Sequence, residues 1–318
     1  MVARTLAADS IDGSSRARAL RLHNWDRLRA AGCLDIVASH LTGHHLFGGV
    51  GLPIFFMLSI ALSVARSSAV DARDFARKRV TRVVIPWLFW SLVTAAEFTL
   101  RARLRGLSGF SWFQPRMLLY GPEVHFWFLP FSACASLGVH RLLRMGDLVS
   151  SLRAATAACL LLALCPRVEW GWPFEQWGFS LPAIALGLML GIALRDEPVR
   201  PFTRVELVLG ALGFLTAALS IAQHVPGSLR YCERHAGALV LVLLALWLPQ
   251  RPDPITRWLT PHLLGVYILH LLVYRTLVEP ALRSIDAGWL SPLRVYAAFV
   301  VTLSIVWLLR RTPLLRVL

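Results

Sequence analysis

Long apolar stretches dominate this chain and limit the ways in which it can fold. A helix that crosses the hydrocarbon core of a bilayer needs about 20 mostly apolar residues. Stretches close to that length recur along the 318 residues, separated by short segments rich in Arg, Pro, Gly and Asp. The composition agrees, because 56% of the residues are hydrophobic and only 16% are charged. Soluble globular proteins are less apolar, so the sequence predicts an integral membrane protein.

The apolar stretches predict an all-α fold of about ten transmembrane helices around a central polar cavity. Their ranges are 28–45, 50–66, 83–100, 124–143, 154–170, 178–194, 205–225, 236–249, 262–278 and 293–309. An even number of helices places both termini on the same side of the membrane. We therefore expect a tail over 1–27, one membrane domain over 28–309 and a second tail over 310–318.

The basic residues orient these helices. Of the 33 Lys and Arg residues, 23 fall on the side of the two termini, if Arg29 is counted with the first tail. Because positively charged loops resist translocation, we expect both termini to be cytoplasmic. Segment 101–122, which has four arginines among Trp, Phe and Tyr, is expected at the outer interface. The formal charge of +15 is spread over helix ends rather than gathered in a soluble basic domain, so we expect no nucleic-acid partner.

The five cysteines are well separated, are odd in number and form no C-x-x-C pair. This pattern indicates neither a disulfide framework nor a zinc site. We expect the cysteines to be small buried hydrophobic residues. A disulfide between Cys165 and Cys232, which both fall near predicted outer ends, is a weaker alternative.

The first predicted helix carries ionisable side chains that a lipid-facing helix would avoid. Eleven residues separate Arg29 from His40, which amounts to three turns plus about 20°, so both side chains share one face about 16 Å apart. An ionisable residue inside the bilayer indicates a functional site by default. The alternatives are a snorkelling Arg29 and a hydrogen-bonded core His40. Asp35 lies about 120° away around the helix and is expected to pair with a group on a neighbouring helix.

Other polar side chains receive no chemical role from the sequence. His40 and His44 are one helical turn apart, but no third ligand is evident, so we expect no metal. Glu97, Glu123 and Arg275 fall near predicted outer ends, where water is expected to satisfy them.

Several segments, in order, resemble the membrane-bound acyltransferase family 3. The first helix matches the R-x10-H pattern of the family, with Asp26, Arg27 and Leu28 before Arg29 and then His40. The second helix resembles the family through "GGVGLPIFFMLSIALS", in which Ile60 replaces the usual glycine after Ser59. The segments "FARKRVTRVVIPWLFW", "HFWFLP" and "LGVYILH" provide three further matches.

The resemblance implies transfer of an acyl group, often acetyl, from acyl-CoA to a sugar or another extracytoplasmic acceptor. It implies that Arg29 positions the donor and that His40 is the general base for the acceptor hydroxyl. The anionic donor needs cations on the cytoplasmic side, and the expected ones are Arg73, Arg77, Lys78, Arg79 and Arg82. Topology and contact with anionic lipid are the alternative explanation for this basic cluster.

The expected acceptor site draws on five residues: Trp127, His125, Tyr267, His270 and Ser59. Aromatic faces suit sugar rings, but Trp127 and His125 are also typical of an interfacial belt. Ser59 is a conceivable acyl carrier and, alternatively, a helix-packing serine. We expect membrane lipid and a sugar or glycan as partners, in the cytoplasmic membrane of a bacterium. A transporter or flippase of a glycan intermediate, or a non-catalytic scaffold, are the competing functions.

Overall fold

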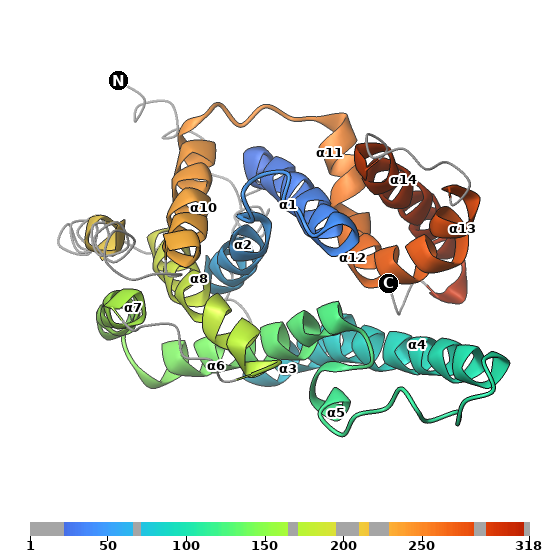
Figure 1. Ribbon diagram of the computed structural model, residues 1–318. Helices are drawn as coiled ribbons and strands as arrows, with labels where there is room; N and C mark the ends of the chain where they lie inside the picture. The colour runs from blue at the N-terminus through green and yellow to red at the C-terminus, as the bar shows by residue number, and fades with distance from the viewer. Residues whose placement is uncertain are drawn as a thin grey trace.

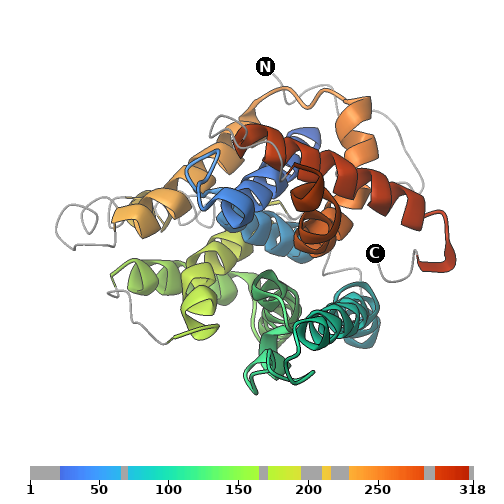
Figure 2. The ribbon, with the colours of Figure 1, turned by 45° about the vertical axis from the view of Figure 1, so that its right-hand side comes forward.

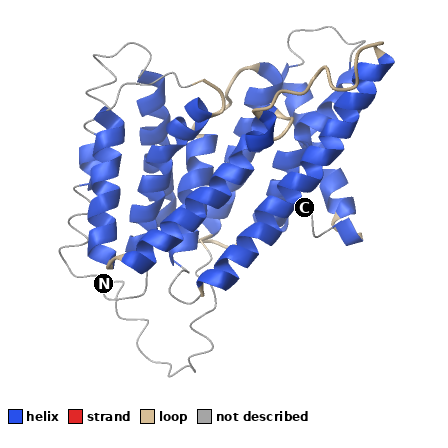
Figure 3. Ribbon diagram, turned by 90° about the horizontal axis from the view of Figure 1, so that it is seen from below, coloured by secondary structure: helices blue, strands red, loops and turns tan. Residues whose placement is uncertain are grey.

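The computed structural model describes residues 22–65, 71–164, 171–194, 210–215, 229–282 and 291–314. Within these ranges the secondary structure is helical and there is no strand. The helices run roughly alongside one another, with the loops gathered at their ends (Figure 3). The all-α prediction is therefore confirmed for the part of the chain that is described.

The helices follow one another with short connections in the described ranges. In the first half they are α1 (His23–Thr42), α2 (Gly51–Ala65), α3 (Ala72–Arg79), the π-helix η2 (Val80–Val84), α4 (Ile85–Leu104), α5 (Met117–Tyr120), the 3₁₀-helix η3 (Val124–Trp127), α6 (Phe128–Met145) and α7 (Leu148–Leu164). In the second half they are α8 (Phe174–Ala193), α10 (Leu229–Trp247), α11 (Pro254–Leu259), η4 (Thr260–His262), α12 (Leu263–Val273), η5 (Tyr274–Val278), α13 (Glu279–Leu282) and α14 (Ser291–Leu309).

Five helical segments among the described residues are long and apolar enough to cross a membrane, so the protein is an integral membrane protein. They are Ala72–Leu104, Val124–Met145, Phe174–Ala193, Pro254–Leu282 and Pro292–Leu309. The predicted number of ten spans is not confirmed. Helices α2 and α7 have only 15 and 17 residues, and most of the predicted span 205–225 lies outside the described residues.

The first predicted span shows why mean hydropathy alone can miss a helix inside a membrane protein. Helix α1 has 20 residues, but Asp26, Arg27, Arg29 and Asp35 lower its mean hydropathy. Figure 1 shows α1 and α2 in the middle of the bundle, with α8 and α10 on one side, α12 and α14 on another, and α3, α4 and α6 along a third; Figure 2 gives the same arrangement from a second direction. A helix surrounded by protein can carry charges that a lipid-facing helix cannot.

Glycines allow the central helices to approach closely. At the crossing of α1 and α2, a Cβ atom on Gly51 would lie 2.6 Å from the carbonyl oxygen of Gly32. On α8, a Cβ atom on Gly187 would lie 2.7 Å from the carbonyl oxygen of Met57 on α2, and Gly191 is packed as tightly one turn later. Small residues four apart let membrane helices pack backbone to backbone. This packing fixes the position of α2 between α1 and α8.

The expectation that water satisfies Glu97, Glu123 and Arg275 is wrong. Arg275 on η5 forms ion pairs with Glu123 and, at 3.4 Å, with Glu97 on α4. Glu97 also pairs with Arg101 one turn later on α4. Glu123 is buried, with 5% of its surface exposed. The three segments converge in the fold, so the charges neutralise one another. These residues are far apart in the sequence, so the contact could not be predicted from it.

The cysteines are only partly as predicted. Cys33 and Cys232 are buried free thiols, whereas Cys134 is exposed on the outer surface of α6. The alternative disulfide between Cys165 and Cys232 involves a residue that lies outside the described ranges.

Candidate active site

Helix α1 presents its two singled-out side chains to two different cavities. Arg29, near the beginning of α1, lines a cavity of about 180 Å³, which we call the Arg29 cavity. His40, near the end of α1, lines a cavity of about 630 Å³, which we call the His40 cavity. Both side chains point into the protein, as the shared helical face requires. The helix therefore connects two internal cavities along its length.

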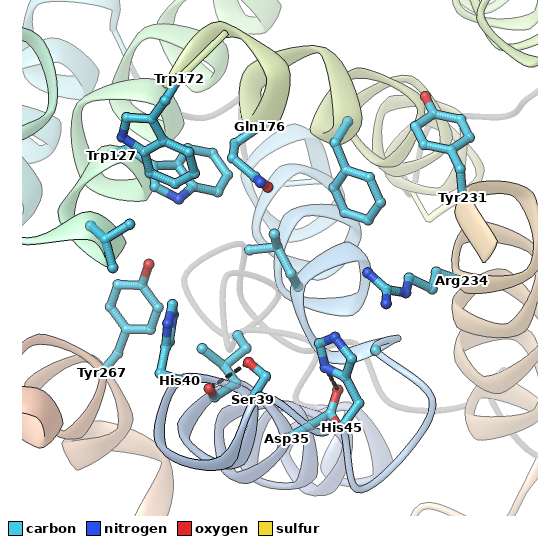
Figure 4. A pocket seen from close by; sticks show the side chains of 16 residues that line it. Asp35, Ser39, His40, His45, Trp127, Trp172, Gln176, Tyr231, Arg234 and Tyr267 are labelled. Carbon is cyan, nitrogen blue, oxygen red and sulfur yellow. Dashed lines mark hydrogen bonds and ion pairs between the residues drawn. The ribbon is translucent and has the colours of Figure 1, made fainter. Parts of the chain in front are cut away.

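The His40 cavity is bounded by α1, α2, η3, α8, α10 and α12 (Figure 4). Trp127 and Trp172 lie on one wall with their ring centroids 6.4 Å apart, and Gln176 points into the space beside them. Arg234 extends from α10 on the opposite wall toward His45. The cavity thus combines aromatic faces with a few polar groups, a pattern typical of sites that bind small polar ligands.

Asp35 organises the loop that forms one rim of this cavity. Its carboxylate accepts hydrogen bonds from the backbone N–H groups of Phe47 and Gly51, at 2.8 and 3.2 Å, and lies 3.8 Å from the His45 ring. Gly51 begins α2, so the negative charge lies at a helix N-terminus, where it is stabilised. The prediction that Asp35 pairs with a neighbouring helix is confirmed, although its partners there are backbone groups. Burial and the Arg234 guanidinium lower the pKa of His45, while Asp35 raises it.

Three imidazole rings from three segments meet at the inner end of the His40 cavity. The His40 ring centroid lies 5.7 Å from that of His125 on η3 and 5.4 Å from that of His270 on α12. His125 and His270 are 4.7 Å apart and fully buried. Only His40 of the three lines the cavity. His125 and His270, predicted to bind substrate, lie behind His40.

Tyr267 holds two parts of this cluster together. Its hydroxyl donates to the backbone carbonyl of His125 at 2.5 Å, and its own backbone carbonyl accepts a hydrogen bond from Nδ1 of His270 at 2.7 Å. The Tyr267 ring also lines the His40 cavity. Tyr267 and His270 are thus joined within α12, and the hydroxyl of Tyr267 extends the contact to η3.

The Arg29 cavity contains basic and hydroxyl groups. Arg79 lines it together with Arg29, and its guanidinium donates to Ser63 at 3.0 Å. Ser59 lines the same cavity. The guanidinium of Arg29 lies 3.9 Å from the carboxylate of Asp26, one turn earlier. The remaining predicted donor-binding residues, Arg77, Lys78 and Arg82, are exposed and line neither of the two cavities, and Arg73 is exposed too.

A layer of aromatic rings lies between the two cavities. Phe56 and Phe128 line the Arg29 cavity, and Trp127 and Tyr267 line the His40 cavity. The Phe56 ring is 4.7 Å from Phe128 and 6.1 Å from Trp127, and Phe128 is 5.1 Å from Tyr267. These contacts place a layer of aromatic rings between residues that line the Arg29 cavity and residues that line the His40 cavity.

Sequence reasoning missed several residues of the His40 cavity. Arg234 lies in a helix whose later turns are apolar, so the argument that singled out Arg29 would also have found it. Trp172, Gln176 and His45 lie in connections or at helix starts, where no periodic pattern marks them. Among the described residues, no group of three or more His, Cys, Asp or Glu side chains is arranged to hold a metal ion.

A family model described as an acyltransferase domain matches residues 22–311, which is most of the chain and includes both cavities. No curated protein and no solved structure matches. The match covers the R-x10-H segment, the second helix and the late Tyr267–His270 element. The chain belongs to acyltransferase family 3.

Proposed function

We propose that this membrane acyltransferase moves an acyl group, most simply acetyl, from cytoplasmic acyl-CoA to a hydroxyl of a sugar or glycan on the other side of a bacterial cytoplasmic membrane. The supporting observation is that α1 carries Arg29 into one cavity and His40 into the other. A thioester that enters by the Arg29 cavity and a hydroxyl that enters by the His40 cavity can meet at the aromatic layer.

The basic residues near the Arg29 cavity support binding of the anionic acyl-CoA on that side of the protein. Acyl-CoA carries several phosphate charges, and guanidinium groups bind phosphates with paired hydrogen bonds. Arg29 and Arg79 line the Arg29 cavity. Three exposed cations lie close to Arg79 in the sequence: Arg77, Lys78 and Arg82. In this proposal the exposed cations attract the nucleotide and the inner guanidinium groups hold the end of the donor that enters the protein. The charge distribution supports a donor site on the side where α1 begins.

The reaction itself needs one base. His40 takes the proton from the acceptor hydroxyl as that oxygen attacks the thioester carbonyl carbon; the new C–O bond forms, the C–S bond breaks, and the CoA thiolate takes the proton from His40. A base in this position accelerates such a step by about 10²- to 10⁴-fold. Trp127 and Trp172 offer ring faces to the sugar. Ser59 and His40 line different cavities, which favours direct transfer over a serine-bound intermediate.

The test uses purified protein in nanodiscs with radiolabelled acetyl-CoA and a panel of methyl glycosides of hexoses, hexosamines and uronic acids. We expect wild type to release CoA and label an acceptor. His40→Ala should lower kcat by at least about 100-fold, and Arg29→Ala should mainly raise the KM for acetyl-CoA. His44→Ala is the matched control, because His44 is an exposed histidine four residues away that lines neither cavity.

Sidedness and the competing function are tested in proteoliposomes. Acetyl-CoA supplied on the side of the termini should support transfer to an acceptor on the other side, and acetyl-CoA on the opposite side should not. Glycan flux without CoA release, unaffected by His40→Ala, would contradict the proposal and favour a transporter.

A further inference from the structure

The two histidines behind His40 each have one nitrogen whose role is fixed by the backbone. Nδ1 of His270 lies 2.7 Å from the carbonyl oxygen of Tyr267, and Nε2 of His125 lies 3.1 Å from the carbonyl oxygen of Ile268. A carbonyl oxygen only accepts, so in each pair the ring nitrogen is the donor. A neutral imidazole has one donor and one acceptor nitrogen. The second nitrogens, Nε2 of His270 and Nδ1 of His125, are therefore unprotonated acceptors.

Both of these acceptor nitrogens are buried. Among the described residues, neither Nε2 of His270 nor Nδ1 of His125 has a hydrogen-bond partner. A buried polar atom without a partner is costly, and it persists in a native structure where it has a role. Of the three histidines, His40 is the one that lines the cavity, and its ring centroid lies 5.4 Å from that of His270 and 5.7 Å from that of His125.

On the basis of the proposed function, we propose that His270 and His125 are positioning residues that set which nitrogen of His40 carries its proton. The acceptor nitrogens attract the N–H of His40 toward the buried side, so the unprotonated nitrogen of His40 faces the cavity. That nitrogen takes the hydroxyl proton. Once the cavity-facing nitrogen has taken the proton, the buried N–H of His40 still points at the acceptor nitrogens of His270 and His125. These nitrogens stabilise the resulting imidazolium.

This arrangement performs with two neutral rings what a carboxylate does in other base-containing sites, where the hydrogen bond to one ring nitrogen fixes the role of the other. Neutral partners suit a buried position, because a carboxylate there would need its own compensating charge. The backbone supplies the orientation, since Tyr267 binds His270 through its carbonyl and His125 through its hydroxyl. The cluster therefore depends on the contact between η3 and α12.

The first experiment removes the acceptor nitrogen. Removing an outer partner that orients a functional histidine typically costs 10- to 100-fold in metal sites, and we take the same range here. We expect His270→Leu to lower kcat by that factor and to leave the KM for acetyl-CoA within about twofold. His270→Gln, whose amide oxygen can take the place of Nε2, should restore most of kcat. His262→Gln is the matched control, because Nδ1 of His262 binds a backbone carbonyl in the same way, away from the cluster. A His270→Leu protein with wild-type kcat would overturn the proposal.

The second experiment needs no activity. Protein with ¹⁵N-labelled histidine gives separate resonances for protonated and unprotonated ring nitrogens. We expect one tautomer of His40 in wild type and a mixture of both tautomers in His270→Leu, with resonances assigned by His40→Ala. An unchanged His40 tautomer in His270→Leu would refute the positioning role. If the tautomer changes but wild type transfers no acyl group to any acceptor, the positioning stands and the proposed function fails.

Discussion

Gly49 makes room for Arg234 at the rim of the His40 cavity. Its backbone has φ +79°, a conformation that favours glycine, and a Cβ atom there would lie 2.6 Å from Nε of Arg234. The adjacent Gly48 has φ +67°, but a Cβ atom there would meet nothing within 4 Å. Alanine substitutions at Gly48 and Gly49 therefore separate the cost of backbone strain from the displacement of the Arg234 guanidinium.

We expect Gly48→Ala and Gly49→Ala to lower the free energy of unfolding by a similar amount, about 1–2 kcal/mol, because both force a left-handed backbone on alanine. Only Gly49→Ala should move Arg234. If Arg234 contacts the acceptor, this variant raises the acceptor KM about fivefold, which is the loss of one hydrogen bond of about 1 kcal/mol. Thermal unfolding in detergent and acceptor titrations measure the two effects. Equal acceptor KM values for both variants would remove Arg234 from the acceptor site.

At the same scale, the sequence could predict that Arg29 and His40 share one face of a helix, because spacing along a regular helix fixes direction. It predicted the partners of His40 poorly. His125 and His270 come from a 3₁₀ turn and a distant helix, and only the tertiary fold brings them to His40. A spacing argument cannot reach a contact of that kind, and so the two residues were expected in the acceptor site.

Glycines of α8 pack closely against α2. A Cβ atom on Gly187 would meet the backbone of α2 at Met57, whereas one on Gly178, earlier on the same helix, would meet nothing within 4 Å. The two glycines therefore have opposite expected responses to the same substitution.

We expect Gly187→Ala to lower the free energy of unfolding by about 1–3 kcal/mol, because the added methyl group overpacks against backbone that cannot move aside. Gly178→Ala should be neutral or stabilising by up to about 1 kcal/mol, since alanine restricts the unfolded chain more than glycine does. Thermal unfolding in one detergent at fixed protein concentration compares them. Equal unfolding temperatures for the two variants would show that α2 and α8 do not pack as described.

Helix boundaries were predicted to within a few residues where the apolar run was long. The predicted 178–194 and 293–309 correspond to α8 (Phe174–Ala193) and α14 (Ser291–Leu309). The prediction 28–45 began too late, because α1 begins at His23 with polar residues. Those residues contact protein: Asn24, for example, donates to the carbonyls of Ala245 and Leu248 at the end of α10. Hydropathy cannot distinguish a polar residue in water from one that binds another helix.

At the scale of the whole molecule, the Arg275 ion pairs connect three regions that are distant in sequence. Arg275 joins α4, through Glu97, to the segment before η3, through Glu123. It therefore holds the C-terminal part of α4 against the segment that leads to His125. Removing one member of a buried ionic group leaves the others uncompensated.

We expect Arg275→Gln to lower the free energy of unfolding by about 1.5–3 kcal/mol, because two carboxylates lose a charged hydrogen-bond donor. Arg105→Gln, at an exposed position, should change it by no more than about 0.5 kcal/mol. The double variant Arg275→Gln with Glu123→Gln should cost less than the sum of the single changes, since the partners interact. Strict additivity in that cycle would show that the ion pair contributes nothing.

The all-helical membrane class could be predicted from composition. The two separate cavities could not, because they depend on how four aromatic rings from α2, α6, α12 and η3 come together. Each ring is an ordinary hydrophobic residue in the sequence.

The aromatic layer between the two cavities has a consequence for the cell that makes the protein. Membrane potential and proton gradients survive only where no hydrated path crosses the bilayer. The rings between the Arg29 cavity and the His40 cavity offer few groups that could hold water or ions, so they favour electrical insulation between two polar cavities of one membrane protein.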